Sequence, residues 1–192
     1  MGKRILVLNG HPDPRPQRLC AALALAYADA ALAAGHEVRR IAIGAFDFPL
    51  LASAEEFASP AEPGVIRNAQ DAISWAEHLV FVYPLWLGSQ PAKLKGFLEQ
   101  IARGGFALGG EKGRIRGMLK GRSAHLYVTM GMPGLVYSLW FGALGVRSLE
   151  SGILRLCGIA PVRHTFFGMV EADPRRPARW LARMHRDGAR AA

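Results

Sequence analysis

The sequence predicts an α/β protein with a parallel β-sheet that carries helices on both faces. About half of the 192 residues are apolar, which fits a globular chain with a substantial core. Short apolar runs alternate with longer segments of helical character, and several runs are continuously apolar, as in strands buried on both faces. Alternation of this kind produces parallel strands joined by helical crossovers. We therefore expect one domain over residues 1–192.

The expected elements alternate from strand to helix along the chain. Strands are expected at residues 3–10, 36–43, 78–83, 122–130 and 162–169. Helices are expected at residues 17–34, 65–75, 91–101, 147–157 and 174–185. Segment 46–64 is punctuated by proline and is expected to be a loop, while the Gly-rich segment 104–121 is expected to be a loop or a hairpin. Ligands of such sheets bind beyond the carboxyl ends of the strands, so the loops after the first, third and fourth strands are the informative ones.

Composition narrows the possible functions. The formal charge is +9, but the basic residues are scattered until segment 175–192, which predicts a solvated basic helix and no nucleic-acid partner. Cys20 and Cys157 form no CxxC or CxxH pattern, so neither structural zinc nor a paired-thiol redox site is expected, and no metal is predicted. No apolar run approaches the length of about 18 residues that a membrane span needs. No signal peptide is recognisable, and a cytoplasmic location is expected.

The loop after the first strand, residues 10–18, is a candidate phosphate site. It contains neither GxGxxG nor GxxxxGK[ST], so the dinucleotide fingerprint and the P-loop are both absent. A helix that follows a parallel strand still presents free N–H groups and partial positive charge. His11 and Arg18 can add donors there. An ordinary strand-to-helix loop with an exposed histidine fits the same residues equally well.

Two further loops can hold a flat ring. Segment 83–96 places Trp86 in a Gly- and Pro-rich stretch at a strand end, where it can form a wall or merely plug the sheet. Segment 129–134 has glycines that let backbone amides approach a ligand closely. Tyr137 follows it and can donate a hydrogen bond to negative charge forming on a reduced ring. A tight turn with a core tyrosine is the alternative interpretation.

Taken together, these segments resemble the flavodoxin-fold NAD(P)H:quinone oxidoreductases, the DT-diaphorase group. That group includes the "modulator of drug activity" type and the ancillary subunits of glutathione-gated potassium efflux systems. The resemblance runs from about Lys3 to Val170 and includes the strand before His11, PLWLGSQPAKLKGFLE, the Thr129–Tyr137 loop and SGILRLCGI. It implies a flavodoxin-like three-layer sandwich with a five-stranded parallel sheet in the order 2-1-3-4-5. It also implies bound FMN or FAD, NAD(P)H as electron donor, a quinone-like small-molecule acceptor and a homodimer.

The resemblance also implies roles for the positions that match the family's motifs. His11 lies at the flavin phosphate, Tyr137 stabilises the reduced flavin, and Glu99 lies near the adenosine half of FAD in members that use FAD. The isoalloxazine ring is lined by Pro84, Leu85, Trp86, Leu87 and Gly88. Its pyrimidine edge is reached by the backbone of Thr129, Gly131 and Met132.

Three departures from the family pattern change what carries over. Residues 16–18 replace the usual Ser-Phe-Asn, which weakens the transfer of FAD-type contacts. Ala143 stands where the family has a histidine beside the tyrosine. Leu108 and Gly110 replace the aromatic pair that caps the quinone, so a different and more open acceptor site is expected.

Two apolar segments predict a protein interface. Residues 47–51 (DFPLL) and residues 135–146 (LVYSLWFGALGV) are strongly apolar for loop regions, and large exposed apolar patches mark interfaces. A homodimer fits them. The alternative is a regulatory flavoprotein subunit that binds a membrane antiporter or another partner and retains residual reductase activity. A flavodoxin-like electron carrier fits less well, because such carriers are usually acidic.

Overall fold

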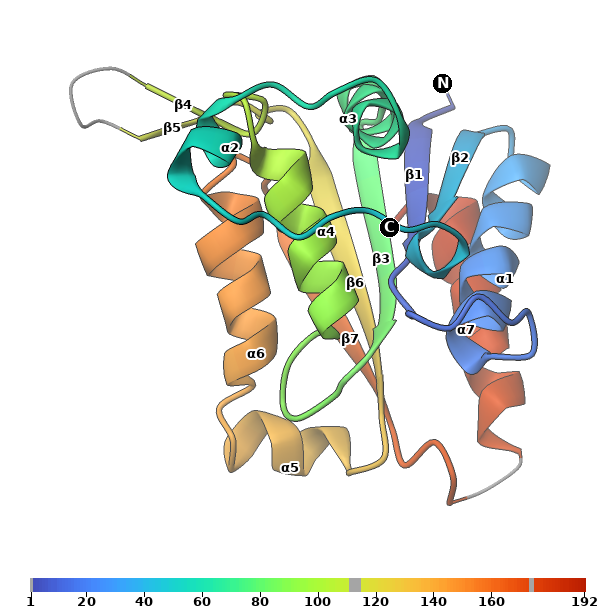
Figure 1. The fold of residues 1–192 in the computed structure, drawn as a ribbon. Coiled ribbons are helices and arrows are strands. Elements are labelled where there is room, and N and C mark those ends of the chain that lie inside the picture. The colour runs from blue at the N-terminus through green and yellow to red at the C-terminus, as the bar shows by residue number, and fades with distance from the viewer. Residues whose placement is uncertain (1, 111–114, 173–174) are drawn as a thin grey trace.

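Five strands form one parallel sheet in the computed structural model of this protein, which describes residues 2–110, 115–172 and 175–192. The strands are β1 (Arg4–Asn9), β2 (Glu37–Ala42), β3 (His78–Pro84), β6 (Ser123–Met130) and β7 (Val162–Gly168). Their spatial order is β2-β1-β3-β6-β7, and every neighbouring pair is parallel. This is the predicted order 2-1-3-4-5, so the predicted fold class is confirmed (Figure 1).

Helices cover both faces of the sheet (Figure 1). One face carries α1 (Leu19–Ala33) and α7 (Arg176–Arg190), and the other carries α3 (Val65–Trp75), α4 (Ala92–Ala102) and α6 (Leu144–Arg147), which continues into the π-helical segment η2 (Ser148–Arg155). All seven residues of β3 are buried. Leu79, Phe81 and Tyr83 face α3 and α4, whereas Val80 and Val82 face α1 and α7, which explains why this strand reads as one apolar run.

The edge strands differ from the central ones. β2 exposes most of its residues, and the guanidinium of Arg39 lies over the Trp75 ring at 4.3 Å from its centroid. β7 forms the other edge, where Arg163 and His164 are exposed. Among the described residues, no helix is both long enough and apolar enough to cross a bilayer.

Short elements occur where the sequence predicts loops. Within 46–64 lies α2 (Ala54–Ala58), following the 3₁₀ turn η1 (Ile43–Ala45). The Ser53 hydroxyl accepts from the Glu56 N–H, and the Glu56 carboxylate accepts from the Ala52 N–H, so the helix start has both halves of a capping arrangement. Within 104–121, β4 (Leu108–Gly109) and β5 (Arg116–Gly117) pair antiparallel, which confirms the hairpin alternative; residues 111–114 lie outside the described residues.

Most predicted helices begin and end within two residues of the observed ones, but three helical segments differ more. A helix, α5 (Gly134–Leu139), occupies part of the segment that was expected to be loop. The helix expected at 147–157 begins at Leu144 and ends at Arg155. The last helix runs to Arg190 rather than to residue 185, and its predicted start at residue 174 lies outside the described residues. In Figure 1, α5 lies across the end of the molecule where the strands finish.

Candidate functional site at the carboxyl ends of the strands

Three loops meet where β1, β3 and β6 end. We call residues 10–18 the first site loop, 85–91 the second and 131–133 the third. The Leu85 N–H donates to the Thr129 carbonyl at 2.7 Å, and the Cys20 thiol lies 3.4 Å from the Thr129 hydroxyl oxygen. The His11 and Trp86 rings meet edge to face, with centroids 5.8 Å apart. The structure therefore brings together the loops that the sequence singles out.

Asp13 organises the first site loop. Its carboxylate accepts from the Arg15 guanidinium at 2.6 Å and from Arg18 Nε at 2.7 Å. It also accepts from the Arg15 N–H at 3.0 Å, which closes a tight turn between prolines. Arg18 is thus held by a carboxylate rather than free, and the two arginines with Asp13 leave one net positive charge. Sequence reasoning missed Asp13; its place two residues before one arginine and five before another was the available signal.

His11 presents one donor to the site. Its Nδ1 accepts from the Asp13 N–H at 3.0 Å, so the neutral ring carries its proton on Nε2. Partial burial lowers the pKa of His11, with Arg18 adding to the effect, which favours this neutral form at neutral pH. Within the described chain, the N–H groups of Gln17, Leu19 and Cys20 have no backbone acceptor. These amides and His11 Nε2 are the donors left for an anion.

The second site loop is a two-residue turn with an exposed apolar tip. Trp86 and Ser89 exchange backbone hydrogen bonds of 2.9 and 3.0 Å. Between them, Leu87 and Gly88 have φ of 47° and 77°, the left-handed conformation that suits glycine and strains leucine. Trp86 is half-exposed, and the Leu87 side chain is fully exposed. The turn therefore presents two apolar side chains beside His11.

The third site loop leaves space for a ligand. Gly131 is exposed, and a Cβ built on it would meet no other atom of the described chain within 4 Å. The carbonyl of Met132 accepts from the Met169 N–H at 3.1 Å, which ties the loop to the end of β7. Thr129, which contacts Leu85 in the second site loop and Cys20 in the first turn of α1, is buried. The backbone around Gly131 is thus fixed at both ends and open at its middle.

Tyr137 links α5 to the second site loop. It is buried, and its hydroxyl donates to the Gly88 carbonyl at 2.9 Å and accepts from the Val146 N–H at 3.3 Å. Burial raises the pKa of Tyr137. A Cβ on Gly145 would lie 2.1 Å from the Gly88 oxygen, so only glycine allows α6 to approach the turn this closely. The phenol hydroxyl is therefore engaged on both sides by backbone groups.

The remaining predicted residues divide into two groups. Pro84 and Leu85 lie among the loops: Pro84 ends β3 opposite Thr129, and Leu85 packs on the core. Glu99 does not join them; it lies two turns into α4, about 10 Å from the start of the helix, in an ion pair with Lys95. No group of three or more His, Cys, Asp or Glu residues able to hold a metal occurs in the described parts of the chain.

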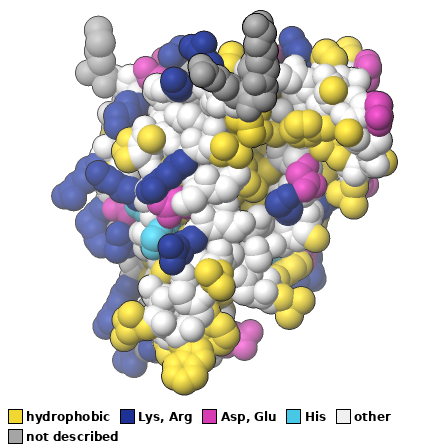
Figure 2. Space-filling view, turned by 90° about the vertical axis from the view of Figure 1, so that its left-hand side faces the viewer, with side chains coloured by type: hydrophobic (Ala, Val, Ile, Leu, Met, Phe, Trp, Pro, Cys, Tyr) yellow, Lys and Arg dark blue, Asp and Glu magenta, His cyan; other side chains and the backbone are white. Residues whose placement is uncertain are grey.

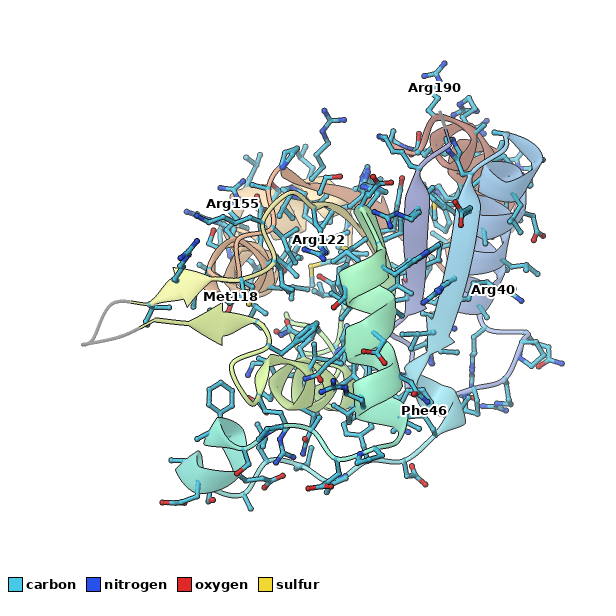
Figure 3. The ribbon with its side chains drawn as sticks, turned by 90° about the horizontal axis from the view of Figure 1, so that it is seen from above. Arg40, Phe46, Met118, Arg122, Arg155 and Arg190 are labelled. Carbon is cyan, nitrogen blue, oxygen red and sulfur yellow. The ribbon has the colours of Figure 1, made fainter. Side chains whose placement is uncertain are left out.

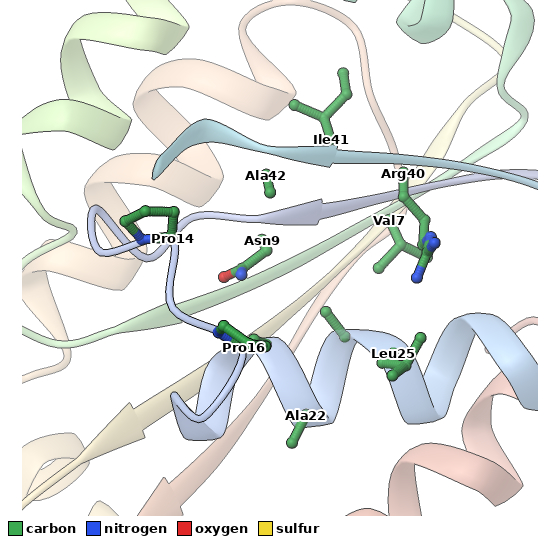
Figure 4. Close-up of a pocket in the computed structure, with 11 residues that line it drawn as sticks. Val7, Asn9, Pro14, Pro16, Ala22, Leu25, Arg40, Ile41 and Ala42 are labelled. Atoms are coloured by element: carbon green, nitrogen blue, oxygen red, sulfur yellow. The ribbon is translucent and has the colours of Figure 1, made fainter. Parts of the chain in front are cut away.

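A cavity of about 470 Å³ lies beside the first site loop, on its outer side (Figure 4). It separates α1 from β2 and is bordered by Pro14, Pro16 and Arg40. Alanines at the helix surface leave this space because they do not reach the strand. None of the predicted site residues lines it, so it is separate from the place where the three loops meet.

Curated relatives share part of this chain. An uncharacterized NAD(P)H oxidoreductase of Haemophilus influenzae is 33% identical over 113 residues, which is 56% of this chain and 54% of that protein. The NAD(P)H dehydrogenase (quinone) 1 of rat is 30% identical over 117 residues, which is 59% of this chain and 42% of that protein. The chain thus spans about half the length of the curated relatives that it matches.

Solved structures match this chain over nearly its whole length. The crystal structure of Smu.1420 from Streptococcus mutans has a TM-score of 0.82 at 27% identity and covers 97% of this chain and 99% of its own. The NAD(P)H:quinone oxidoreductase of Methanothermobacter marburgensis, at 23% identity, has a TM-score of 0.81 with full coverage of both chains, a likeness of fold. The family model described as the flavodoxin-like fold matches residues 3–186. The predicted resemblance is confirmed at this level, and the chain belongs to the family of proteins with the flavodoxin-like fold.

Proposed function

We propose that this protein is a flavin-dependent NAD(P)H oxidoreductase that reduces a quinone or a similar small electrophilic acceptor. The observation that carries the proposal is that the first and second site loops touch through His11 and Trp86, while Thr129, near the end of β6, contacts Leu85 and Cys20 beside them at the carboxyl ends of the strands. The curated relatives with NAD(P)H oxidoreductase and quinone dehydrogenase names support the reaction class.

The residues present fit a flavin. His11 Nε2 and the unpaired amides at the start of α1 suit a phosphate, since a helix N-terminus favours anions. Trp86 offers an apolar wall, and the space beside Gly131 lets a ring edge approach backbone amides. FMN needs only these features. FAD needs an adenosine site as well, for which Glu99 is the candidate residue.

The protein's own groups would bind and orient the flavin and its substrates, and they would not transfer protons. A bound flavin supplies hydride acceptance from NAD(P)H and donation to the acceptor. His11 would hold the phosphate with its Nε2 proton, and Tyr137 holds the turn at Gly88 in place through its hydroxyl. Leu87 and Trp86 border the exposed side, where donor and acceptor would bind in turn. Leu108 and Gly110, which stand where the family has its aromatic pair, lie at the β4–β5 hairpin at the other end of the sheet (Figure 1), so within one copy they do not cap an acceptor at the site loops.

A homodimer forms part of the proposal. Six exposed apolar residues surround α5, and we call them the apolar ridge: Leu135, Val136, Leu139, Trp140, Phe141 and Leu144. Figure 2 shows hydrophobic side chains gathered at the foot of the molecule, the end that α5 covers. The ridge adjoins Leu87, so a second copy bound there would border the site. A cytoplasmic location also belongs to the proposal, because both cysteines are free and buried.

Flavin binding tests the proposed function. Titration of the apo-protein with FMN and with FAD should quench flavin fluorescence and raise the unfolding temperature, since a ligand that binds only the folded state stabilises it. Mass spectrometry of the flavin that co-purifies distinguishes FMN from FAD. Replacement of His11 by Ala should weaken binding about tenfold through loss of one phosphate contact, whereas His185→Ala, on exposed α7 surface, should not. No binding of either flavin would refute the proposal.

The apolar ridge also suits the regulatory alternative, in which it contacts a membrane antiporter or another partner instead of a second copy. Both versions retain flavin and residual reductase activity. Affinity purification from membranes distinguishes them, because a regulatory subunit would bring an integral membrane protein with it and a free-standing reductase would not.

A further inference from the structure

The cavity of about 470 Å³ between α1 and β2 has no part in the proposed flavin site. The edge of the sheet forms one side of it, where Val7 of β1 and Ala42 of β2 line the cavity, and the first turns of α1 form the other side. Figure 3 shows β2 at the edge of the sheet beside α1, with Arg40 on it. Cavities of this volume commonly hold small molecules.

The surface of α1 that borders the cavity is apolar and has short side chains. Ala21, Ala22 and Ala24 line the cavity together with Leu25. Because alanine ends at Cβ, the helix leaves a gap that a flat apolar body can fill. A ring in this gap would remove apolar surface of both the helix and the sheet from water, which favours binding.

Asn9 leaves the nitrogen of its side-chain amide without a partner in this cavity. Asn9 ends β1, is 9% exposed and lines the cavity. Its Oδ1 accepts from the His11 N–H at 3.1 Å, which assigns Nδ2, with its two donor hydrogens, to the other side of the amide. Nδ2 donates to no residue that the structure describes. Buried polar groups are nearly always paired, so this amide points to an acceptor on a ligand.

Arg40 is the one charged side chain among the described residues that line the cavity. It makes no ion pair with any of the described residues. In Figure 4, Arg40 extends from β2 toward α1 and Leu25, whereas Ile41 points to the opposite face of the sheet. A guanidinium with no acidic partner favours a carboxylate, which it binds through two parallel hydrogen bonds.

The pairing of β1 with β2 places both donors on the same face of the sheet. Arg40 lies opposite Val7, and Ala42 lies opposite Asn9, so the two donors are two residues apart along the strands. Two strand residues span about 7 Å, and the apolar side chains of Val7 and Ala42 lie along this span. An aromatic ring system can therefore lie on them with one polar end near each donor.

We propose that this cavity binds an aromatic carboxylate that carries a hydrogen-bond acceptor at the end opposite its carboxylate. The carboxylate pairs with the Arg40 guanidinium, the rings lie against Ala21 and Leu25, and Asn9 Nδ2 donates to the acceptor. The site is independent of the flavin proposal, because no residue assigned to the flavin lines it. Asn9 also binds the His11 N–H, so the ligand would contact the residue that holds the start of the first site loop.

Titration with 6-methoxy-2-naphthoate, a fluorescent probe with both polar ends, tests the proposal. Excess FMN is present throughout, so that any flavin site is filled. The side-chain amide resonances of Asn9 should shift and saturate, while those of exposed Asn68 on α3 stay unchanged. Two matched probes should each bind about tenfold more weakly, because each lacks one polar contact. They are 2-naphthoate, which lacks the acceptor, and 2-methoxynaphthalene, which lacks the carboxylate.

A pair of arginine variants locates the carboxylate. Arg40→Gln should weaken binding of 6-methoxy-2-naphthoate about tenfold or more, through loss of a charged hydrogen bond, and should leave binding of 2-methoxynaphthalene unchanged. Arg39→Gln removes equal charge from the preceding residue, which lies over the Trp75 ring on the other face of the sheet, and should change neither. Equal weakening by both variants would overturn the proposal, because it would show attraction to net charge alone.

A third variant fills the cavity from the helix. Ala21→Leu keeps a strong helix former in α1 and adds bulk where the rings would lie. It should abolish the shift of the Asn9 resonances while circular dichroism stays native. The absence of saturable binding would overturn the proposal, as would Asn9 resonances that stay unchanged at saturation. Displacement of the probe by rising FMN would also overturn it, because the probe would then occupy the flavin site.

Discussion

At the scale of single residues, the Tyr137 hydroxyl contributes both to the stability of the fold and to the position of the second site loop. Tyr137→Phe leaves the Gly88 carbonyl and the Val146 N–H without their shared partner. We expect the free energy of unfolding to fall by about 1–3 kcal/mol. If the proposed flavin site is right, we also expect flavin reduction by NAD(P)H to slow about tenfold, because the turn that would border the ring loses its anchor. Anaerobic stopped-flow absorbance at full flavin occupancy measures the rate.

Tyr127→Phe is the matched control for that variant. Tyr127 is also fully buried, and its hydroxyl donates to the Asp187 carboxylate at 2.9 Å on the opposite face of the sheet. It should lose comparable stability and keep the wild-type reduction rate. Equal rates in both variants would assign Tyr137 a structural role only.

The Leu87–Gly88 turn holds a leucine in a left-handed backbone conformation that favours glycine, and substitution can relieve this strain. Leucine at φ 47° is strained by about 1 kcal/mol relative to glycine. Leu87→Gly should therefore leave stability unchanged or raise it by up to about 1 kcal/mol, while weakening flavin or acceptor binding through loss of apolar surface. Gly88→Ala, at φ 77°, should destabilise instead. Urea unfolding with parallel flavin titration separates the two effects, and a large stability loss in Leu87→Gly would contradict this interpretation.

At the scale of elements, the apolar ridge around α5 predicts assembly. Trp140 is 85% exposed, and Trp140→Glu places a charge where a second copy would pack. We expect a dimer at micromolar concentration in the wild type and a monomer in the variant, by sedimentation velocity. Leu32→Glu makes the same kind of change on exposed α1 surface and should leave the dimer intact. A wild-type monomer would refute the predicted interface.

The elements also show what sequence could predict. β3 was predictable because its short, continuous apolar run indicates a strand buried on both faces. The loops after β1, β3 and β6 were predictable from their glycines and prolines. α2 has a recognisable start signal, Ser53 followed by Glu56, within a proline-punctuated segment that predicts a loop. α5 had none: its first residue is glycine, it lacks a side-chain cap, and its apolar residues face outward. Contacts such as Asp13 with Arg18 required the folded loop.

At the scale of the whole molecule, the two buried histidines predict acid sensitivity. His78 and His125 have pKa values of about 4 in the fold and 6.5 when exposed, because burial disfavours their cations. Lys3 adds to this effect at His78, whereas the backbone oxygen of Ala192 opposes it at both rings and Asp187 opposes it at His125. A lowered pKa means that the unfolded chain binds protons first as pH falls. Stability is therefore complete above pH 6.5 and falls toward pH 4, by about 1.4 kcal/mol per pH unit for each histidine.

Urea unfolding at several pH values in phosphate-free buffer measures that slope. His125→Phe should reduce it by about 1.4 kcal/mol per pH unit, since one of the two groups is gone. His185→Phe, on exposed α7 surface, should leave it unchanged. A slope that neither variant alters would show that other groups control the acid response.

The two edge strands of the sheet have a consequence for how copies of this chain behave when crowded. A parallel sheet ends in unpaired N–H and C=O groups that can template further strands and start aggregates. β2 carries Arg39 and Arg40 there, and β7 carries Arg163 beside His164. Two copies that approach edge to edge meet like charge before any backbone bond can form. At physiological salt this repulsion is largely screened beyond about 8 Å, so it acts only at the short range where strand pairing would begin.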